Sequence, residues 1–413
     1  MKTIYMDNGA TSYPKPECVL QAVNDYILNV GASINRSVYE KAQDAGIVTY
    51  TLRERLARLF NHNEPKNVVI TPGNTYGLNM VIRGYLKPGD HCLVSSAEHN
   101  AVMRPLVQLS KTGIEFDRIP CDSAGYIMTD QIEAMIKENT RLVIICHASN
   151  VGGAVNDIET IGKICKKHNI EFVVDAAQSA GHYPIDFKAA KLSALSVPGH
   201  KGLMGPQGIG ALLMTSEFAS KLDPIIAGGT GSISDTEEIP EYMPDKFESG
   251  TANLPGIYGF EAALHFIEDR GIREFENHEK KLTKHFIDGI HKIQEEINLS
   301  SAEIPTENKQ RSCSENTSNR NQNITIRIAG PDNIDKRVGV ISLDFIGLDN
   351  ADVSYELETK YGILTRCGMH CAPSAHKTLG TFPQGVVRFT PGYYNTEEDI
   401  DSVLNAIREI IKK

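Results

Sequence analysis

The stretch RLVIICHASNVGGAVNDIETIGKICKKHNIEFVVDAA, residues 141–177, decides the fold. It begins with RLVIICHAS (141–149) and ends with EFVVDAA (171–177), two apolar runs rich in valine or isoleucine that predict buried strands. Between them, DIETIGKICKKHN has apolar residues at helical spacing: Ile158, Ile161, Ile164 and Cys165. Strands joined through a helix form a parallel pair with a right-handed crossover. This stretch therefore predicts an α/β domain built on a parallel sheet.

The same alternation of short apolar runs and amphipathic stretches extends upstream and downstream of this unit. NVVIT at 67–71 and HCLVSS at 91–96 predict two further buried strands. In an open parallel sheet, ligands bind beyond the carboxyl ends of the strands. Functional residues are therefore expected in the loops that follow these strands.

The C-terminal third has a different pattern. Apolar residues at helical spacing predict long amphipathic helices across 282–297 and 400–411, and Thr396 is the expected N-cap of the second. Between these helices, GVISLDF and GVVRFTP are typical of strands. The pattern indicates a second domain of the α+β class.

A length of 413 residues fits two or three domains. We expect a large domain over residues 15–262, and a small α+β domain formed by residues 1–14 together with 263–413. Residues near 299–324 are polar and poor in large apolar side chains, which predicts a mobile surface excursion without chemistry of its own.

Composition and charge exclude several classes of protein. Hydrophobic residues make up 41% of the chain, enough for a sizeable core, and the net charge of −10 has the wrong sign for holding a nucleic-acid backbone. Residues 1–12 contain no apolar core of a signal peptide, and no run of about 18 apolar residues occurs. We therefore expect a cytoplasmic protein with no membrane or nucleic-acid partner. The eight cysteines are scattered, unlike a secreted disulfide framework, and only Cys367 and Cys371 lie close in sequence.

Two residues, Lys201 and Asp175, point to a cofactor when they are taken together. Lys201, in PGHKGLMGPQGIGALL (198–213), would by itself fit a solvated loop lysine, and GPQGIG lacks the strand–turn–helix context of a phosphate-binding fingerprint. Asp175, however, ends a buried strand and needs a cationic partner. A protonated pyridine nitrogen would serve, and the pair would make the ring an electron sink. Lys201 would then form a Schiff base with the cofactor aldehyde.

On these residues the chain resembles the fold-type I pyridoxal-phosphate enzymes of aminotransferase class V, the group that contains the cysteine desulfurases. Further motifs match that family in order along nearly the whole chain. The matching segments are DNGATS (7–12), GNTYGLN (73–79), AEHNA (97–101), HASNVGG (147–153), VVDAAQ (173–178) and FESGTAN (247–253). The resemblance implies a large domain with a mostly parallel sheet flanked by helices, a smaller C-terminal α+β domain, and pyridoxal 5′-phosphate as cofactor.

The resemblance also assigns residues around the cofactor ring. His99 occupies the position of an imidazole that stacks on the pyridine, and it is a candidate proton carrier. Asn150 and Gln178 would hydrogen-bond the ring hydroxyl side, and Asn150 would also contact the substrate. Asp175 would hold the ring nitrogen, and Lys201 would move the α-proton.

A second set of residues would hold the cofactor phosphate. Asn74 and Thr75 match the turn at a helix N-terminus, where free N–H groups suit an anion. Pro198 stands where related desulfurases usually carry a serine, so one phosphate contact must be lost or supplied elsewhere, for example by Asn74 or His200. Thr251 would reach the partner subunit's phosphate in a homodimer.

The segment TRCGMHCAPSAH (365–376) resembles the R-x-G-H-H-C-A motif of group II cysteine desulfurases and selenocysteine lyases. It makes Cys371 the expected nucleophile, with His370 and nearby positive charge favouring the thiolate. The first histidine of the motif is Met369 here. Arg388 would clamp the substrate carboxylate with its planar fork, and Arg366 also aligns with a family arginine.

Two other interpretations concern the same segment. Cys367 could exchange transiently with Cys371, although a permanent disulfide does not suit a reducing compartment. Alternatively, Cys367, His370, Cys371 and His376 could bind zinc, but the spacing is compressed and lacks a distant second half. We therefore expect no metal.

The resemblance implies that L-cysteine is converted to L-alanine while sulfur passes to Cys371 as a persulfide, and then to an acceptor protein or a reductant. A selenocysteine lyase is the first alternative, in which Cys371 would orient or protonate selenium. Asn100 and Met369 stand at positions commonly occupied by histidine in group II enzymes, which suggests an altered substrate preference. An aminotransferase or other lyase of class V would need no Cys371. A non-catalytic sulfur-relay or scaffold protein is disfavoured by Lys201 and Asp175.

Overall fold

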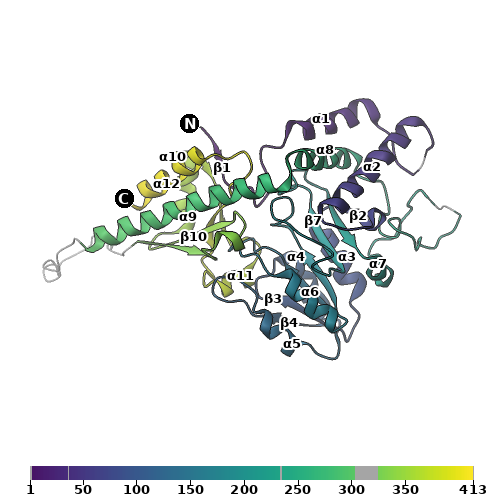
Figure 1. The fold of residues 1–413 in the computed structure, drawn as a ribbon, viewed down its shortest axis with the longest axis horizontal. Coiled ribbons are helices and arrows are strands. Elements are labelled where there is room, and N and C mark those ends of the chain that lie inside the picture. Colours follow the sequence, from purple (N-terminus) through teal and green to yellow (C-terminus); the bar gives the residue numbers. More distant parts are fainter. Residues whose placement is uncertain (1, 36, 233–234, 303–323, 413) are drawn as a thin grey trace.

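The computed structural model describes residues 2–35, 37–232, 235–302 and 324–412 (Figure 1). Its larger sheet has seven strands in the order β2-β8-β7-β6-β5-β3-β4. The strands are β2 (Val68–Thr71), β3 (His91–Ser95), β4 (Glu115–Ile119), β5 (Thr140–Cys146), β6 (Glu171–Asp175), β7 (Ala194–Pro198) and β8 (Gly210–Met214). Only β8 runs antiparallel to its neighbours. The predicted, mostly parallel sheet is therefore confirmed, including its four sequence-predicted strands.

Helices cover both faces of this sheet (Figure 1). They are α1 (Glu17–Asp25), the π-helix η1 (Tyr26–Val30), α2 (Glu40–Leu59), α3 (Asn74–Tyr85), α4 (Asn100–Ser110), α5 (Ile132–Met135), α6 (Ile158–Lys167), α7 (Ser216–Lys221) and α8 (Leu254–Arg270), with short 3₁₀ turns η2 (Pro65–Asn67) and η3 (Thr129–Gln131). The predicted helix between two strands is α6, and Asp157 caps it by accepting from the Thr160 N–H. Gly162 permits its close packing, because a Cβ there would meet the Ala190 carbonyl oxygen at 1.9 Å.

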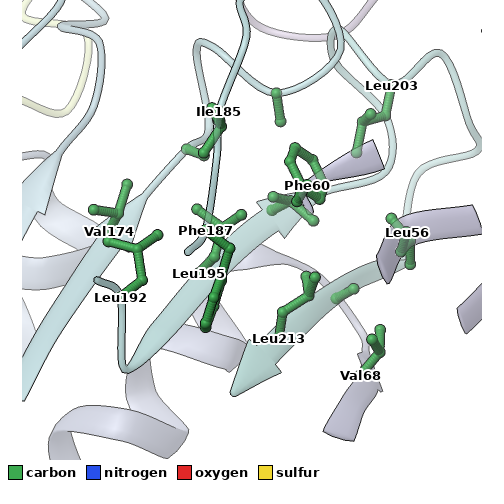
Figure 2. Close-up of a cluster of buried hydrophobic side chains, with 14 of the residues drawn as sticks. Leu56, Phe60, Val68, Val174, Ile185, Phe187, Leu192, Leu195, Leu203 and Leu213 are labelled. Atoms are coloured by element: carbon green, nitrogen blue, oxygen red, sulfur yellow. The ribbon is translucent and has the colours of Figure 1, made fainter. Parts of the chain in front are cut away.

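The strands alternate their side chains between two apolar cores. Val174 and Leu195 face one cluster, whereas Val173 and Ala194 face the other. Figure 2 shows part of the first cluster, in which Phe60 at the end of α2 lies among strand residues. Each large apolar side chain buried in this way contributes roughly 1.5–3 kcal/mol to folding. The strand ends are consequently held rigidly, and the loops that follow them inherit that rigidity.

The C-terminal third forms a smaller antiparallel sheet in the order β12-β13-β10-β9. Its elements are α9 (Ile272–Ala302), β9 (Thr325–Ala329), the 3₁₀ turn η5 (Ile334–Lys336), β10 (Ile341–Ile346), α10 (Asn350–Tyr361), β11 (Ile363–Leu364), β12 (Arg366–Gly368), α11 (Pro373–Thr378), β13 (Val386–Phe389) and α12 (Glu397–Ile411). Thr396 caps α12 in a capping box with Asp399, as the sequence predicts. The N-terminal strand β1 (Ile4–Tyr5) pairs with β11. Ile4 and Met6, which follows this strand, pack in the apolar core of the smaller sheet.

Two expectations concern the boundaries of segments. Helix α9 continues to Ala302, so the polar excursion does not begin at 299; the remainder, residues 303–323, lies outside the described residues. The predicted division of the chain at residue 262 falls within α8 and stays a prediction. Within the described ranges, no helix has the length and apolar character needed to cross a membrane.

Candidate active site

A cavity of about 610 Å³ lies at the carboxyl ends of the parallel strands. Cys146, Asp175 and Pro198, the last residues of β5, β6 and β7, form part of its wall. The cavity brings together eight of the predicted site residues: Asn74, Thr75, His99, Asn150, Asp175, Gln178, His200 and Lys201. They come from strand ends and helix starts that are distant in sequence, which is where an open α/β sheet places ligands.

Asp175 is buried at the end of β6 and does not stand alone. Its Oδ1 accepts hydrogen bonds from Asn74 Nδ2 at 2.8 Å and from the Ala177 N–H at 2.9 Å. The Asn74 side chain therefore donates to the carboxylate expected to hold the cofactor ring. The Asn74 Oδ1 atom is buried without a hydrogen-bond partner among the described residues. It can therefore accept a hydrogen bond from a ligand or a water molecule.

Helix α3 begins at Asn74, and the first N–H groups of a helix have no partner within the helix. Its N-cap, Gly73, has φ 153°, and no atom lies within 4 Å of the position that a Cβ would take. His200 adds a buried Nδ1 without a partner in the described part of the chain, and its pKa is lowered to about 4 by burial and by the charges of Lys201 and Lys15. A neutral imidazole and free helix N–H groups suit a phosphate.

Lys201 is the buried amine of the cavity. Burial lowers its pKa from 10.5 to about 8, Asp175 opposes that shift, and Arg388 and Arg366 add to it. Its reactivity as a neutral amine at ordinary pH therefore follows from its position. The sequence pattern located Lys201 but not this shift, because burial belongs to the folded chain.

The N-terminal segment fixes the peptide between His200 and Lys201. The His200 carbonyl accepts from the Ser12 N–H at 3.0 Å, from Thr11 Oγ1 at 3.1 Å and from Lys15 Nζ at 2.7 Å. This explains why DNGATS, far from the sheet in sequence, belongs to the site. Lys15 is a site residue that the sequence analysis missed; its position between Pro14 and Pro16 is the only local signal.

His99 is the N-cap of α4, and its Nδ1 accepts from the Ala101 N–H at 3.0 Å. Burial is the main cause that lowers its pKa, so the ring is neutral and carries its proton on Nε2. Gln178 donates to the Gly9 carbonyl at 3.0 Å, and Asn150 donates to the His370 carbonyl at 2.8 Å. Each of these amides retains a second N–H and an oxygen for a ligand.

Arg388 is almost fully buried and already has an anionic partner. Its Nη2 lies 2.7 Å from Asp7 Oδ1, and its Nη1 donates to the Asn150 carbonyl at 3.2 Å. Its Nε is buried without a partner among the described residues. Asp7 lies in the DNGATS motif, but nothing in the sequence indicated its role: it neutralises the arginine that we expect to clamp the substrate.

Replacing Asp7 by asparagine is expected to lower the free energy of unfolding by about 3–5 kcal/mol, because it leaves the Arg388 charge buried and unpaired. The side chain of Arg388 is only 1% exposed. Chemical denaturation of the full chain measures the change. Asp335→Asn is the control: its carboxylate lies 3.6 Å from Lys280 and is 87% exposed, so its loss is worth less than about 1 kcal/mol. Equal effects of the two substitutions would contradict the assignment.

The loop that carries Cys371 has an unusual backbone. His370 and Cys371 have φ angles of 48° and 55°, the left-handed region that costs a non-glycine residue roughly 1–2 kcal/mol. Hydrogen bonds hold the loop there: Asn150 donates to the His370 carbonyl, the Asn100 N–H donates to the Cys371 carbonyl at 2.8 Å, and the Ala372 N–H donates to the Met369 carbonyl at 2.9 Å. Cys371 itself is exposed.

His370 carries no positive charge beside Cys371, and its expected effect on the thiolate stays a prediction. His370 is buried, and burial together with Arg388 lowers its pKa to about 3. Its ring is therefore neutral, stacked 5.8 Å from the ring of His376. The cations that act on this loop are Arg366 and Arg388.

Cys367 has a different environment from Cys371. Its side chain lies on β12 opposite Val387 and packs against the apolar core of the smaller sheet, and burial raises its pKa. Both cysteines are free thiols. Within the described ranges, no three histidine, cysteine or acidic side chains gather as a metal site would need.

Thr251 is exposed and is not among the residues that line the cavity. Its expected contact requires a second copy of the chain and stays a prediction. Arg366 and Arg388 also stand outside the cavity wall, although both influence the pKa of Lys201.

Comparison with known proteins agrees with this geometry. A family model described as Aminotransferase class-V matches residues 4–317 and 305–403. A probable cysteine desulfurase of Pyrococcus abyssi is 33% identical over 100% of this chain and 95% of its own length, and cysteine desulfurase CsdA of Escherichia coli is 29% identical over 98% and 93%. The apo structure of cysteine desulfurase from Thermococcus onnurineus NA1 superposes with a TM-score of 0.86 at 31% identity, covering 99% of this chain and 95% of that one.

The family model covers most of the chain, and the relatives align along its full length. The expected fold-type I architecture, a mostly parallel sheet between helices, is the one that the structure has. The chain belongs to the aminotransferase class-V family.

Proposed function

We propose that this protein is a pyridoxal-phosphate-dependent cysteine desulfurase that converts L-cysteine to L-alanine and takes up the sulfur on Cys371. One observation carries the proposal: Lys201 and Asp175 line one cavity, and the wall residue Asn150 of that cavity is hydrogen-bonded to the loop of the exposed Cys371. An aminotransferase would need the lysine but not the cysteine. Curated relatives aligned over the full chain carry the name cysteine desulfurase.

The residues present fit the proposed cofactor. When bound, pyridoxal phosphate supplies an aldehyde that captures amines and a ring that withdraws electrons. The N-terminus of α3 and the unpartnered His200 Nδ1 would hold its phosphate, and the Asp175 carboxylate would hold its ring nitrogen. The neutral His99 ring would lie against it. The Asn74 side chain keeps Asp175 oriented, and its expected contact with the phosphate stays a prediction.

The side chains of this protein would divide the reaction between them. Arg388 would bind the substrate carboxylate, and Lys201, with a pKa of about 8, would remove and return protons at the substrate carbons. The Cys371 thiolate would attack the substrate sulfur. An S–S bond then forms, the Cβ–S bond breaks, and the carbon keeps the electron pair and takes up a proton to become the methyl group of alanine.

The proposal extends to partners. Cys371 is exposed, so a persulfide on it would be accessible to an acceptor protein or a reductant. We also propose a homodimer in which Thr251 reaches the second active site. Two features support it: Thr251 is exposed, and the N-terminal helical segments expose apolar side chains, including Leu20, Leu28 and Ile47. Cytoplasmic location is part of the same proposal, because the nucleophile must stay reduced.

Purified protein incubated with pyridoxal phosphate, L-cysteine and a thiol reductant tests the function. We expect alanine and sulfide in equal amounts and a visible absorption band from the bound cofactor. L-Selenocysteine in a parallel reaction separates the two lyase activities. Bound cofactor without alanine from either substrate would contradict the proposal and favour another class-V reaction; a protein that binds no cofactor would contradict the enzyme assignment itself.

A further inference from the structure

The Cys371 loop is held in a conformation that its own residues do not favour. His370 and Cys371 are consecutive non-glycine residues in the left-handed region. Such residues remain there only where the surroundings hold them. Because φ and ψ set the direction of the Cα–Cβ bond, the same conformation sets where the Cys371 thiol points.

Two donors from outside the loop hold this conformation. One is the Asn150 side chain, which lines the cavity and donates to the His370 carbonyl. The other is the backbone N–H of Asn100, which donates to the Cys371 carbonyl at 2.8 Å. Asn100 is the first residue of α4, so its N–H has no partner within the helix and is available for this bond.

The position of Asn100 links the loop to the cofactor side of the cavity. Its neighbour His99 is the N-cap of α4 and lines the cavity, and the next N–H, that of Ala101, donates to the His99 ring. Two consecutive N–H groups at the start of α4 therefore have two partners. The Ala101 N–H orients the His99 imidazole, and the Asn100 N–H orients the Cys371 backbone.

We propose that Asn100 is a positioning residue for the nucleophile: its backbone N–H, donated to the Cys371 carbonyl, keeps the Cys371 thiol aligned with the substrate sulfur. This inference rests on the proposed desulfurase function and adds a residue to it. The side chain at position 100 is not required; the N–H is. A displacement of about 1 Å at a reacting atom can cost on the order of 100-fold in rate.

Asn100→Pro removes this hydrogen bond, and its ring Cδ also takes the place of the hydrogen that faces the Cys371 carbonyl oxygen, so the variant displaces the loop as well as losing the donor. An ester in place of the peptide bond between residues 99 and 100 removes the donor alone. Proline lacks the N–H but fits the first position of a helix. The preceding residue must be extended, and His99 already has φ −73° and ψ 155°. Asn100→Ala removes the side chain and keeps the N–H, so it is the matched control. We expect kcat for alanine formation to be at least ~10-fold lower in Asn100→Pro than in Asn100→Ala, the variant that keeps the N–H.

Three further readouts separate positioning from a general loss of structure. In Asn100→Pro, the KM for L-cysteine, the absorption of the bound cofactor and the thermal midpoint should match those of Asn100→Ala. Replacing the peptide bond between residues 99 and 100 of the alanine variant by an ester removes the same N–H without a ring, and the same fall in kcat is expected whether or not the proline variant folds.

The outcomes are distinct. Wild-type kcat in the proline or ester variant overturns the inference. Loss of the cofactor absorption also overturns it, because the N–H would then act through His99 and the cofactor. Wild-type protein that forms no alanine from L-cysteine sinks the proposed function instead, whichever variant is compared.

Discussion

Replacing Lys201 by alanine is expected to lower the turnover of L-cysteine by at least about 10⁴-fold and to abolish the visible absorption of the bound cofactor. The reason lies in the burial of the amine. With its pKa near 8, about half of Lys201 is the neutral, reactive amine at pH 8, whereas an ordinary lysine would be only ~0.3% neutral. Among the residues that the structure describes, no other lysine lines the cavity.

Absorption spectra and alanine formation measure the two effects on the same preparation. Lys111→Ala is the control, because Lys111 is exposed at the end of α4 and does not line the cavity. We expect that variant to behave as wild type. A Lys201→Ala protein that still shows the cofactor band and turns over L-cysteine at more than about one hundredth of the normal rate would refute the role of Lys201.

The second large effect is expected from Cys371→Ala, which should lower alanine formation from L-cysteine by at least ~10³-fold while leaving the cofactor absorption intact. The thiol is the proposed acceptor of the substrate sulfur, and the variant has no group to take it. Cys367→Ala is a matched control four residues away. Its thiol packs in the smaller core, so turnover should stay within ~2-fold of wild type.

The same pair of variants distinguishes the two substrates. If Cys371→Ala loses activity toward L-cysteine and keeps it toward L-selenocysteine, selenium elimination does not need attack by this thiol. If Cys371→Ala desulfurates L-cysteine at the wild-type rate, the nucleophile is assigned wrongly. If Cys367→Ala is the inactive variant, the exchange between the two cysteines has to be reconsidered.

Much of the fold could be predicted because it depends on local periodicity. Val173 and Val174 lie in an unbroken apolar run, which is typical of a strand buried on both faces, and each valine lies in a different core. The spacing of Ile158, Ile161 and Cys165 predicts α6, and these residues are buried on it. Residue type and spacing alone carry this information. The end of α9 was harder to place, since a polar stretch can continue a helix that has already begun.

The candidate site divides in the same way. The chemical types of Lys201, Asp175 and Cys371 are visible in the chain, and motif order brings them into one hypothesis. The protonation states and hydrogen-bond partners of the site residues cannot be predicted from the sequence. The neutrality of His370 comes from burial, and the engagement of Asn74 with Asp175 comes from the approach of α3 to the end of β6.

By itself, the sequence determined the alternation of strands and helices in the large domain, the identity of the amine, carboxylate and thiol, and the family. Only the tertiary structure decided the pKa values of these groups and the directions in which they point. Asp7 reaches Arg388 across 381 positions, and the Asn100 N–H reaches the Cys371 carbonyl across 271. A backbone N–H is the same in every residue except proline, so no sequence pattern marks the one that meets the nucleophile loop. Desolvation and long-range contacts exist only once the chain is folded, and they give Lys201 its pKa and the Cys371 loop its conformation.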